Sequence, residues 1–253
     1  MTMPSLAALI PARRGSQRVK NKNIRILGQH PLIAYTIAQA KIAGCFSSVF
    51  VSTDCAEIAE IAQKYGAEVL GLRPAEYATS TSPDIDWILH LLKLLEQDGR
   101  LPDAFSLLRP TSPFRRPETI NKAWKAFKNT SGVDSLRAVE KCLQHPGKMW
   151  VIRDGRLIPI LPFGDPPWHS IQYQSLPEVY VQNASLEIAW ISVPLENGTI
   201  AGSTVMPWIS EEYDGFDINT QEDWNTSERL LASGKVKISE DIESFLISHS
   251  QQS

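Results

Sequence analysis

Short apolar runs alternate with longer amphipathic stretches over the first half of the chain. Continuous apolar runs predict buried strands, and apolar residues that recur about every three or four positions predict helices. We expect strands at 6–10, 49–51, 68–70 and 104–108. Helices are expected to begin near Pro31, which suits a first helical turn, near Asp54, which can cap the helix that follows it, and near Ser82 and Pro117. Repeated strand–helix units indicate an α/β fold with a mostly parallel sheet. Such sheets bind ligands beyond the carboxyl ends of their strands, so we expect the chemistry in the loops that begin near Pro11, Gly71 and Arg109.

The pattern changes after a strand signal at 135–139. From 140 to 180 no long helical stripe is present, and prolines and aromatic residues punctuate the segment, as is typical of short strands and turns. We therefore expect an inserted β-rich arm at 140–180, between the parts 1–139 and 181–253 of one α/β domain. An apolar strand pattern returns at 184–192, and helices are expected from Thr220, which begins a capping-box-like sequence, and at 241–248.

Composition narrows the class of protein. The 253 residues, 43% of them hydrophobic, carry a formal net charge of −3, which argues against general nucleic-acid binding. No apolar run reaches the roughly 18–20 residues that span a bilayer, and no secretory signal pattern is seen. The three cysteines are widely spaced and odd in number, as in a protein with reduced thiols. We expect a cytoplasmic protein without nucleic-acid or membrane partners.

A strongly basic segment follows the first predicted strand. Residues 13–25 read RRGSQRVKNKNIR and contain six cations and no acid. Mutual repulsion makes this arrangement unfavourable unless solvent or an anion screens it, and Arg and Lys are the side chains that bind phosphate oxygens. Neither G-x-x-x-x-G-K-[ST] nor G-x-G-x-x-G occurs at this point, which argues against a P-loop ATPase and an ordinary NAD dehydrogenase. The segment is either a polyphosphate site or a solvated basic loop.

Six segments in the same order resemble the signature of the CMP-sialic acid synthetases, the cytidylyltransferases that activate sialic and related nonulosonic acids. The segments are IPARRGSQR at 10–18 with Lys22-Asn23, VSTD at 51–54, LRPAE at 72–76, LRPTSP at 108–113, QNA at 182–184 and FDIN at 216–219. The resemblance implies a Rossmann-like nucleotide-diphospho-sugar transferase fold whose arm pairs with a second subunit. It also implies that CTP and an acidic 2-keto sugar give a CMP-sugar and pyrophosphate.

The resemblance assigns roles to residues by position. Arg13 and Lys22 are expected to hold the CTP phosphates, with the Ser16 side chain and backbone N–H groups at Ala12 and Gly15. Asn23 is expected to lie against the nucleotide, and Arg73 and Ser82 to border the cytosine. Without the resemblance, Arg73 could equally be an exposed loop arginine.

A magnesium site is expected at Asp217 and Asn219. Residues i and i+2 of an extended segment face the same side, and Mg²⁺ prefers oxygen ligands shared with substrate phosphates. The family normally has a second aspartate where this chain has Asn219, and an amide oxygen contributes no charge. Asn219 or Thr220 could instead cap the helix that follows.

Four further residues are candidates for the sugar side. Arg109 follows the fourth expected strand, where a cation suits an acidic sugar, although a surface or pairing role is the alternative. Gln182 and Asn183 carry amides that could bind sugar hydroxyls or satisfy the backbone. Lys148 in the arm aligns with a sugar-binding lysine of the family, whereas Tyr173 aligns with a carboxylate-binding arginine. That departure argues for a sugar acid other than N-acetylneuraminate.

These observations predict an enzyme that uses CTP, a nonulosonic acid and Mg²⁺, and that forms a homodimer through its arm. The expected chemistry is in-line attack by the anomeric hydroxyl on the α-phosphate, with Arg13, Lys22 and Asp217 as the catalytic residues. A 3-deoxy-octulosonate cytidylyltransferase is one alternative. A non-catalytic nucleotide-binding subunit is the other, and the amide at Asn219 is its support.

Overall fold

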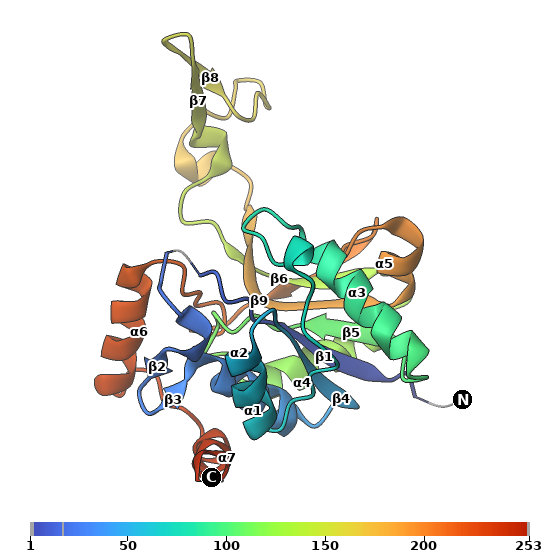
Figure 1. Cartoon of the computed structure of the whole chain (residues 1–253). Coiled ribbons are helices and arrows are strands. Elements are labelled where there is room, and N and C mark those ends of the chain that lie inside the picture. The colour runs from blue at the N-terminus through green and yellow to red at the C-terminus, as the bar shows by residue number, and fades with distance from the viewer. Residues whose placement is uncertain (1–2, 17, 252–253) are drawn as a thin grey trace. The chain divides into compact units, whose positions relative to one another are not determined.

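The computed structural model describes residues 3–16 and 18–251 (Figure 1). The chain divides into two units, one made of Met1–Ala138 with Asn183–Ser253 and the other of Val139–Gln182. The boundaries expected from the sequence, after 139 and after 180, fall within two residues of this division. Each unit is described below by itself.

A six-stranded sheet organises the first unit, in the order β10-β6-β9-β5-β1-β4. Its strands are β1 (Leu6–Pro11), β4 (Ser48–Ser52), β5 (Ala104–Leu107), β6 (Ser135–Lys141), β9 (Tyr180–Trp190) and β10 (Val205–Ile209). Strand β1 pairs in parallel with β4 and with β5, as the strand–helix alternation predicts. Strand β9 returns antiparallel beside β5, with Glu187 opposite Leu107. The predicted α/β fold is therefore confirmed, with one antiparallel neighbour that the alternation does not reveal.

Helices cover this sheet and bury two apolar clusters. They are α1 (Leu32–Ala43), α2 (Ala56–Lys64), α3 (Asp84–Gln97), α4 (Pro117–Lys128), α5 (Ser192–Asn197), α6 (Gln221–Ala232) and α7 (Glu240–Ser250). Alternate residues of a strand face opposite sides of a sheet. Accordingly Leu6, Ala8 and Ile10 of β1 belong to one cluster, while Ala7 and Leu9 pack with α3 in the other. None of the helices among residues 3–16 and 18–251 has the length and apolar character needed to cross a membrane.

Several local expectations were wrong. Asp54 does not cap α2, whose N-cap is Cys55, because the Asp54 carboxylate accepts the Arg14 backbone N–H at 2.8 Å. Residues 68–70 form no strand beyond a single bridge from Glu68 to Phe50.

The basic loop also has more structure than expected. It contains a 3₁₀ turn, η1 (Lys22–Ile24), and leads into a small hairpin of β2 (Ile26–Leu27) and β3 (His30–Pro31). Pro31 therefore precedes α1 and does not lie in its first turn. Helix α5 and strand β10 were not expected at all, because their short segments carry no clear apolar period.

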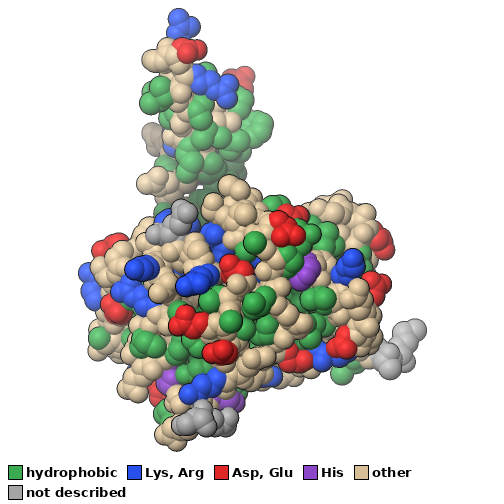
Figure 2. All heavy atoms as spheres, in the orientation of Figure 1, with side chains coloured by type: hydrophobic (Ala, Val, Ile, Leu, Met, Phe, Trp, Pro, Cys, Tyr) green, Lys and Arg blue, Asp and Glu red, His purple; other side chains and the backbone are tan. Residues whose placement is uncertain are grey.

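The second unit contains a hairpin of β7 (Trp150–Arg153) and β8 (Arg156–Pro159). Two 3₁₀ turns, η3 (Pro146–Lys148) and η4 (Tyr173–Ser175), accompany the hairpin. The unit carries many exposed apolar side chains, visible over the hairpin in Figure 2. They are Leu143, Met149, Trp150, Val151, Ile152, Leu157, Ile158, Ile160, Phe163 and Tyr173.

Candidate active site

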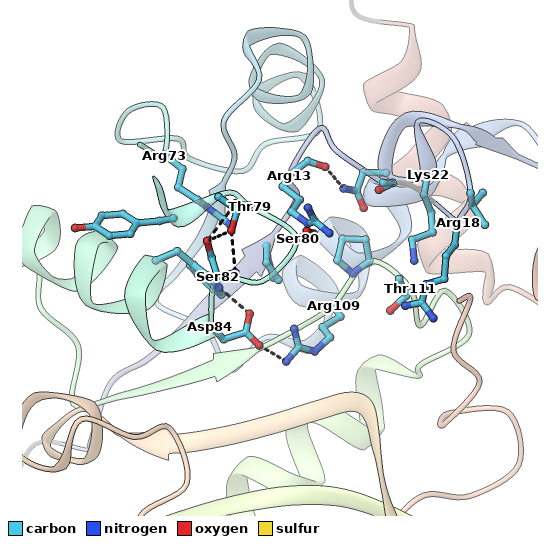
Figure 3. Close-up of a pocket in the computed structure, with 17 residues that line it drawn as sticks. Arg13, Arg18, Lys22, Arg73, Thr79, Ser80, Ser82, Asp84, Arg109 and Thr111 are labelled. Carbon is cyan, nitrogen blue, oxygen red and sulfur yellow. Dashed lines mark hydrogen bonds and ion pairs between the residues drawn. The ribbon is translucent and has the colours of Figure 1, made fainter. Parts of the chain in front are cut away.

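A cavity of about 230 Å³ opens at the carboxyl ends of β1 and β5 in the first unit (Figure 3). Three segments line it: the basic loop after β1, residues 73–87 leading into α3, and the loop after β5. These are the loops in which the strand order predicts the chemistry. The lining residues are Pro11, Arg13, Ser16, Arg18, Val19, Lys22, Asn23, Arg73, Tyr77, Thr79, Ser80, Ser82, Asp84, Trp87, Arg109, Pro110 and Thr111.

Three cations of the basic loop face this cavity: Arg13, Arg18 and Lys22. Lys22 Nζ donates to the Ile218 carbonyl at 2.7 Å, and Arg18 Nη2 donates to Asn219 Oδ1 at 3.3 Å. The loop after β1 thus contacts the segment 217–219, which lies about two hundred residues later in the sequence. A solvated basic loop therefore does not describe Arg13 and Lys22, which are partly buried, whereas Arg18 faces the cavity from an exposed position.

The other three cations of the loop have different surroundings. Arg14 and Lys20 are exposed. Arg25 donates to Gln221 Oε1 at 2.8 Å, and its guanidinium lies 4.2 Å from the centroid of the Trp224 ring. Arg25 therefore connects the loop to α6. Of the six cations in the basic segment, three line the cavity and three do not.

The cations around the cavity repel one another. Burial lowers the pKa of Lys22, and Arg18 and Arg13 lower it further, although Asp217 and Asp223 oppose this effect. Burial also lowers the pKa of Arg73 to about 10, with Arg13 adding to the effect and Asp54 and Asp84 opposing it. The Arg13 guanidinium takes part in none of the hydrogen bonds or ion pairs found among the described residues. An anion in the cavity would relieve this repulsion.

The side of the cavity nearest α3 is polar and well ordered by hydrogen bonds. Arg73 is buried, donates through Nε and Nη2 to the Oγ and carbonyl of Ser52 at 3.0 and 2.8 Å, and lies 4.8 Å from the centroid of the Trp87 ring. The alternative of an exposed loop arginine is thus excluded. Ser82 Oγ donates to the Glu76 carbonyl at 2.8 Å and contacts Thr79 Oγ1 at 2.6 Å. These bonds shape the loop that presents the Ser82 side chain.

Arg109 lines the cavity within a chain of ion pairs. Its Nη2 lies 2.7 Å from Asp84 Oδ2 and 3.1 Å from Glu187 Oε1, and Arg137 Nη1 lies 2.6 Å from Glu187 Oε2. Burial raises the pKa of Asp84, but the hydrogen bond and charge of Arg109 outweigh it, so the pKa of Asp84 is lowered. Burial likewise opposes the charged form of Arg109, but Asp84 and Glu187 outweigh it and raise the pKa of Arg109. The structure therefore places Arg109 in a pairing role as well as in the cavity wall.

The segment at 217–219 offers oxygen atoms that could hold a cation. Asp217 Oδ1 is buried and accepts no hydrogen bond from the described residues, whereas Asp217 Oδ2 accepts one from the Asn219 amide. Thr220 is the N-cap of α6 and forms a capping box with Asp223, so Asn219 is not the cap. Among the residues that the structure describes, no three His, Cys, Asp or Glu side chains cluster as a metal site. One free carboxylate oxygen still fits Mg²⁺, which commonly takes one or two carboxylates plus substrate phosphates.

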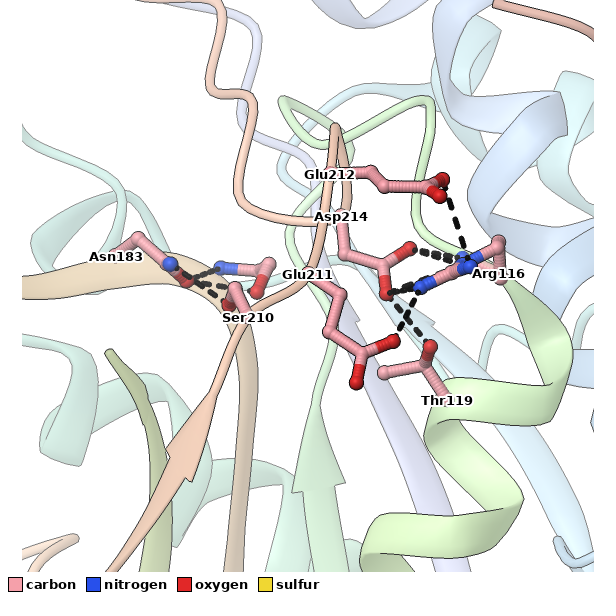
Figure 4. A network of polar contacts seen from close by, with 8 residues as sticks. Arg116, Thr119, Asn183, Ser210, Glu211, Glu212 and Asp214 are labelled. Atoms are coloured by element: carbon pink, nitrogen blue, oxygen red, sulfur yellow. Dashed lines mark hydrogen bonds and ion pairs between the residues drawn. The ribbon is translucent and has the colours of Figure 1, made fainter. Parts of the chain in front are cut away.

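The loop that leads to Asp217 is anchored firmly (Figure 4). Asp214 accepts hydrogen bonds from Arg116 Nη2 at 2.9 Å and from Thr119 Oγ1 at 2.6 Å. Further along, the Ile218 N–H donates to the Thr111 carbonyl at 2.9 Å. Asp217 is therefore fixed between α4 and the loop after β5.

Comparison with known proteins decides the family. The cytidylyltransferase family model matches residues 7–142. The chain is 36% identical, over 89% of its length and 96% of the relative's, to the CMP-N,N'-diacetyllegionaminic acid synthase of Legionella pneumophila. This chain belongs to the cytidylyltransferase family. It is also 31% identical, over 87% of its length, to the N-acylneuraminate cytidylyltransferase of Escherichia coli, of which it covers 50%.

The cytidylyltransferase fold also appears in solved structures. A CMP:2-keto-3-deoxy-manno-octonic acid synthetase complexed with CTP superposes with a TM-score of 0.66 at 14% sequence identity, covering 91% of this chain and 99% of that one. The 4-diphosphocytidyl-2C-methyl-D-erythritol synthase of Anaerococcus prevotii superposes with a TM-score of 0.61, also at 14% identity, covering 91% of this chain and all of that one. At this identity the likeness shows the fold alone.

Some residues expected in the site of this cytidylyltransferase have other contacts. Ala12 is buried and its N–H donates to the Ser52 carbonyl at 2.9 Å, so that donor is already used, and Gly15 is exposed beside the cavity-lining Ser16. Asn183 is buried, donates to Ser210 Oγ at 2.9 Å and accepts from the Ser185 hydroxyl at 2.7 Å. Both groups of its amide are therefore occupied by hydrogen bonds within the protein (Figure 4).

Two expected sugar-binding residues lie in the second unit. Lys148 Nζ donates to the carbonyls of His169, at 3.0 Å, and Ile171, and Gln182 is exposed. Tyr173 donates to the Leu143 carbonyl at 2.9 Å. Roles for Lys148 and Gln182 at the sugar stay predictions.

Sequence reasoning missed the partners of Arg109. Asp84, Glu187 and Arg137 were not among the site residues expected from the sequence. A signal existed for Glu187, because a lone acid within the apolar run 184–192 must find a partner when that strand is buried. The hydroxyl-rich run at 79–82 was a comparable signal for the wall beside Arg73.

Proposed function

We propose that this cytidylyltransferase transfers CMP from CTP to a nonulosonic acid, an acidic 2-keto sugar of the sialic type, and releases pyrophosphate. The observation that carries the proposal is that three cations, Arg13, Lys22 and Arg73, line one cavity, where burial and the nearby Arg13 charge lower the pKa of the other two. A triphosphate supplies the negative charge that this cavity lacks. The relatives that synthesise CMP-linked legionaminic acid and activate acylneuraminate indicate the acceptor.

The reaction needs no covalent enzyme intermediate. The anomeric hydroxyl oxygen of the sugar acid bonds to the α-phosphorus of CTP, and the bond from that phosphorus to the pyrophosphate oxygen breaks. The hydroxyl proton passes to solvent. Arg13 and Lys22 neutralise the charge that grows on the leaving pyrophosphate, with Ser16 as a further donor. Asn23 lies against the nucleotide, while Arg73 and Ser82 border the cytosine, and these contacts hold CTP in place for in-line attack.

Asp217 would hold Mg²⁺, because its buried Oδ1 has no hydrogen-bond partner among the described residues. The Asn219 amide oxygen is the second candidate ligand and adds no charge; in the structure this oxygen accepts from Arg18 and the amide nitrogen faces Asp217, so the amide would have to turn to reach the ion. When bound, the ion supplies Lewis-acid polarisation of the phosphate oxygens. The reliance on a single carboxylate makes Asp217 the more important of the two residues.

The second unit supports a homodimer. Its exposed apolar side chains, among them Trp150, Ile158 and Ile160, lie on or next to one hairpin, and groups of exposed apolar side chains commonly mark protein–protein contact sites. A second copy of the same unit would cover that surface. By analogy with the family resemblance, Lys148 and Gln182 would then border a sugar pocket.

A panel assay tests the proposed function. CTP, Mg²⁺ and one sugar acid at a time are mixed with the protein, and pyrophosphate release is measured for diacetyllegionaminic acid, pseudaminic acid, N-acetylneuraminic acid and 3-deoxy-octulosonic acid. We expect turnover with a nonulosonic acid and with CTP in preference to other nucleotides. Turnover with 3-deoxy-octulosonic acid alone would identify the related activity instead. CTP binding without pyrophosphate release from any acceptor would identify a non-catalytic subunit.

A further inference from the structure

Four alternating charges form a continuous chain beside the cavity. Asp84 begins α3, Arg109 follows β5, Glu187 lies in β9 and Arg137 in β6. Successive members are 2.7, 3.1 and 2.6 Å apart. The charges of the two cations and the two carboxylates cancel, so the charge that Arg109 presents to the cavity is neutralised by its neighbours. In this respect it differs from Arg13, which lies in the same cavity without an ion-pair partner among the described residues.

The arrangement fixes how Arg109 presents its donors. Both carboxylates are bound by Nη2, so the two N–H bonds of that nitrogen are used. A guanidinium has five N–H donors, and the three on Nη1 and Nε have no partner among the described residues. These three are free for a ligand in the cavity that Arg109 lines.

Glu187 holds this arrangement from within the sheet. Its side chain is only 6% exposed, and it stands opposite Leu107, two residues before Arg109, where β9 pairs with β5. The Trp87 indole donates to Asp84 Oδ1 at 2.8 Å and fixes the other carboxylate. Arg109 is thus held from two different elements, the sheet and the start of α3, which leaves its guanidinium little freedom to rotate.

We propose that Arg109 binds uncharged oxygen atoms of the sugar acid, its hydroxyl or N-acyl carbonyl groups, and that Glu187 is the residue that positions Arg109 for this contact. The inference rests on the proposed cytidylyl transfer. If Arg13 and Lys22 bind the triphosphate and Arg73 and Ser82 the cytosine, the wall near Arg109 is left for the acceptor. A guanidinium that already faces two carboxylates is a poor counter-ion for a third, but it remains a directional hydrogen-bond donor.

A double-mutant cycle tests the positioning role. Glu187→Gln, Arg109→Gln and the double variant are compared with the unmodified protein, using the most active sugar acid of the panel. Because small misplacements of a substrate-binding group cost up to about 100-fold, we expect Glu187→Gln to lower kcat/KM for the sugar acid by roughly 10- to 100-fold. The Kd for CTP, measured by calorimetry, should change less than about 2-fold. In the Arg109→Gln background the Glu187 change should have no further effect.

Losses that multiply in the double variant, or an equal loss of CTP affinity, would overturn the positioning role. Because Glu187 is buried, Glu187→Asp serves as a second variant that keeps the charge but shortens its reach. Thermal unfolding of each variant separates the two cases. If Glu187 were purely structural, its substitution would lower the melting temperature and would weaken kcat/KM for the sugar acid and CTP binding to a similar degree. We expect the sugar-selective loss in Glu187→Asp as well.

The methyl ester of the sugar acid tests which atoms Arg109 binds. If Arg109 binds uncharged oxygens, Arg109→Gln lowers kcat/KM by the same factor for the acid and for its ester. A loss confined to the acid would show that Arg109 pairs with the carboxylate and would overturn the inference. Failure of the proposed function itself looks different, because the unmodified protein would then release no pyrophosphate with any acid of the panel.

Discussion

Replacing Arg13 by methionine removes one positive charge from the cavity and keeps most of the aliphatic stem. In the free protein this charge makes no ion pair or hydrogen bond to the described residues, and it lowers the pKa of both Lys22 and Arg73. Its removal should therefore leave the free energy of unfolding within about 0.5 kcal/mol of the original value. The effect of the substitution should appear when CTP binds and reacts.

The expected loss follows from phosphate contacts. Hydrogen bonds to charged groups contribute about 1.5–3 kcal/mol each, which converts to a roughly 10- to 150-fold weaker Kd for CTP if Arg13→Met removes one of them. A donor aimed at charge that develops in the transition state is worth about 100- to 1,000-fold in kcat. Calorimetric CTP binding, pyrophosphate release and thermal unfolding measure the three quantities separately.

Arg14→Met is the matched control for this prediction. It removes a positive charge from the next residue in the sequence, whose exposed side chain is not among the described residues lining the cavity. The hydrogen bond from its backbone N–H to Asp54 is kept. We expect kcat within about 2-fold of the original value, as for most surface changes. If both variants lost activity equally, net charge would be the cause. If Arg13→Met bound CTP normally but unfolded several kcal/mol more easily, Arg13 would be a structural residue.

Three further predictions concern the metal, pH and the second unit. Asp217→Asn should abolish pyrophosphate release, and EDTA should do the same to the unmodified protein until Mg²⁺ is added; full activity without divalent ions would remove Asp217 from the mechanism. Because burial holds the pKa of Lys22 below 10.5, Lys22 loses its proton at a lower pH than a free lysine, so kcat/KM for CTP should fall as pH rises through that lowered pKa. Lys22→Arg should retain activity further into the alkaline range, and identical pH profiles would contradict this role. Ile158→Asp should convert a dimer into a monomer in light scattering, whereas an unchanged mass would show that β8 is not the interface.

The sheet and the position of the cavity could be predicted from the sequence because both depend on local pattern. Strand and helix periods place the three loops at one end of a parallel sheet, and the excess of cations marks one of those loops. The pairing of β9 with β5 depends on distant segments, so the neighbour of Arg109 could not be inferred. Glu187 is seventy-eight residues away from Arg109 in sequence.

Local rules also failed where a side chain serves a distant loop. Asp54 has the sequence position of a helix cap, yet its carboxylate accepts the N–H of Arg14 and supports the basic loop. Its charge also opposes the lowering of the pKa of Arg73. Capping propensity describes only the nearest backbone, and it contains no information on a loop forty residues earlier in the chain. The residue that was wrongly predicted to cap α2, Asp54, therefore supports the loop that lines the cavity.

The contrast between Arg13 and Arg109 gives the cavity a physical means of telling its two ligands apart. A triphosphate is drawn to the cations whose repulsion it relieves, and these lie along the loop after β1. If Arg109 were also unpaired, the phosphates would have a competing site on the wall left for the acceptor. Asp84 and Glu187 remove that competition, because any anion approaching Arg109 meets two carboxylates within about 3 Å of it. In the proposed binding mode, neutralising one arginine and leaving the other free would therefore favour the orientation of CTP that places its phosphates along the loop after β1 and leaves the wall near Arg109 to the sugar acid.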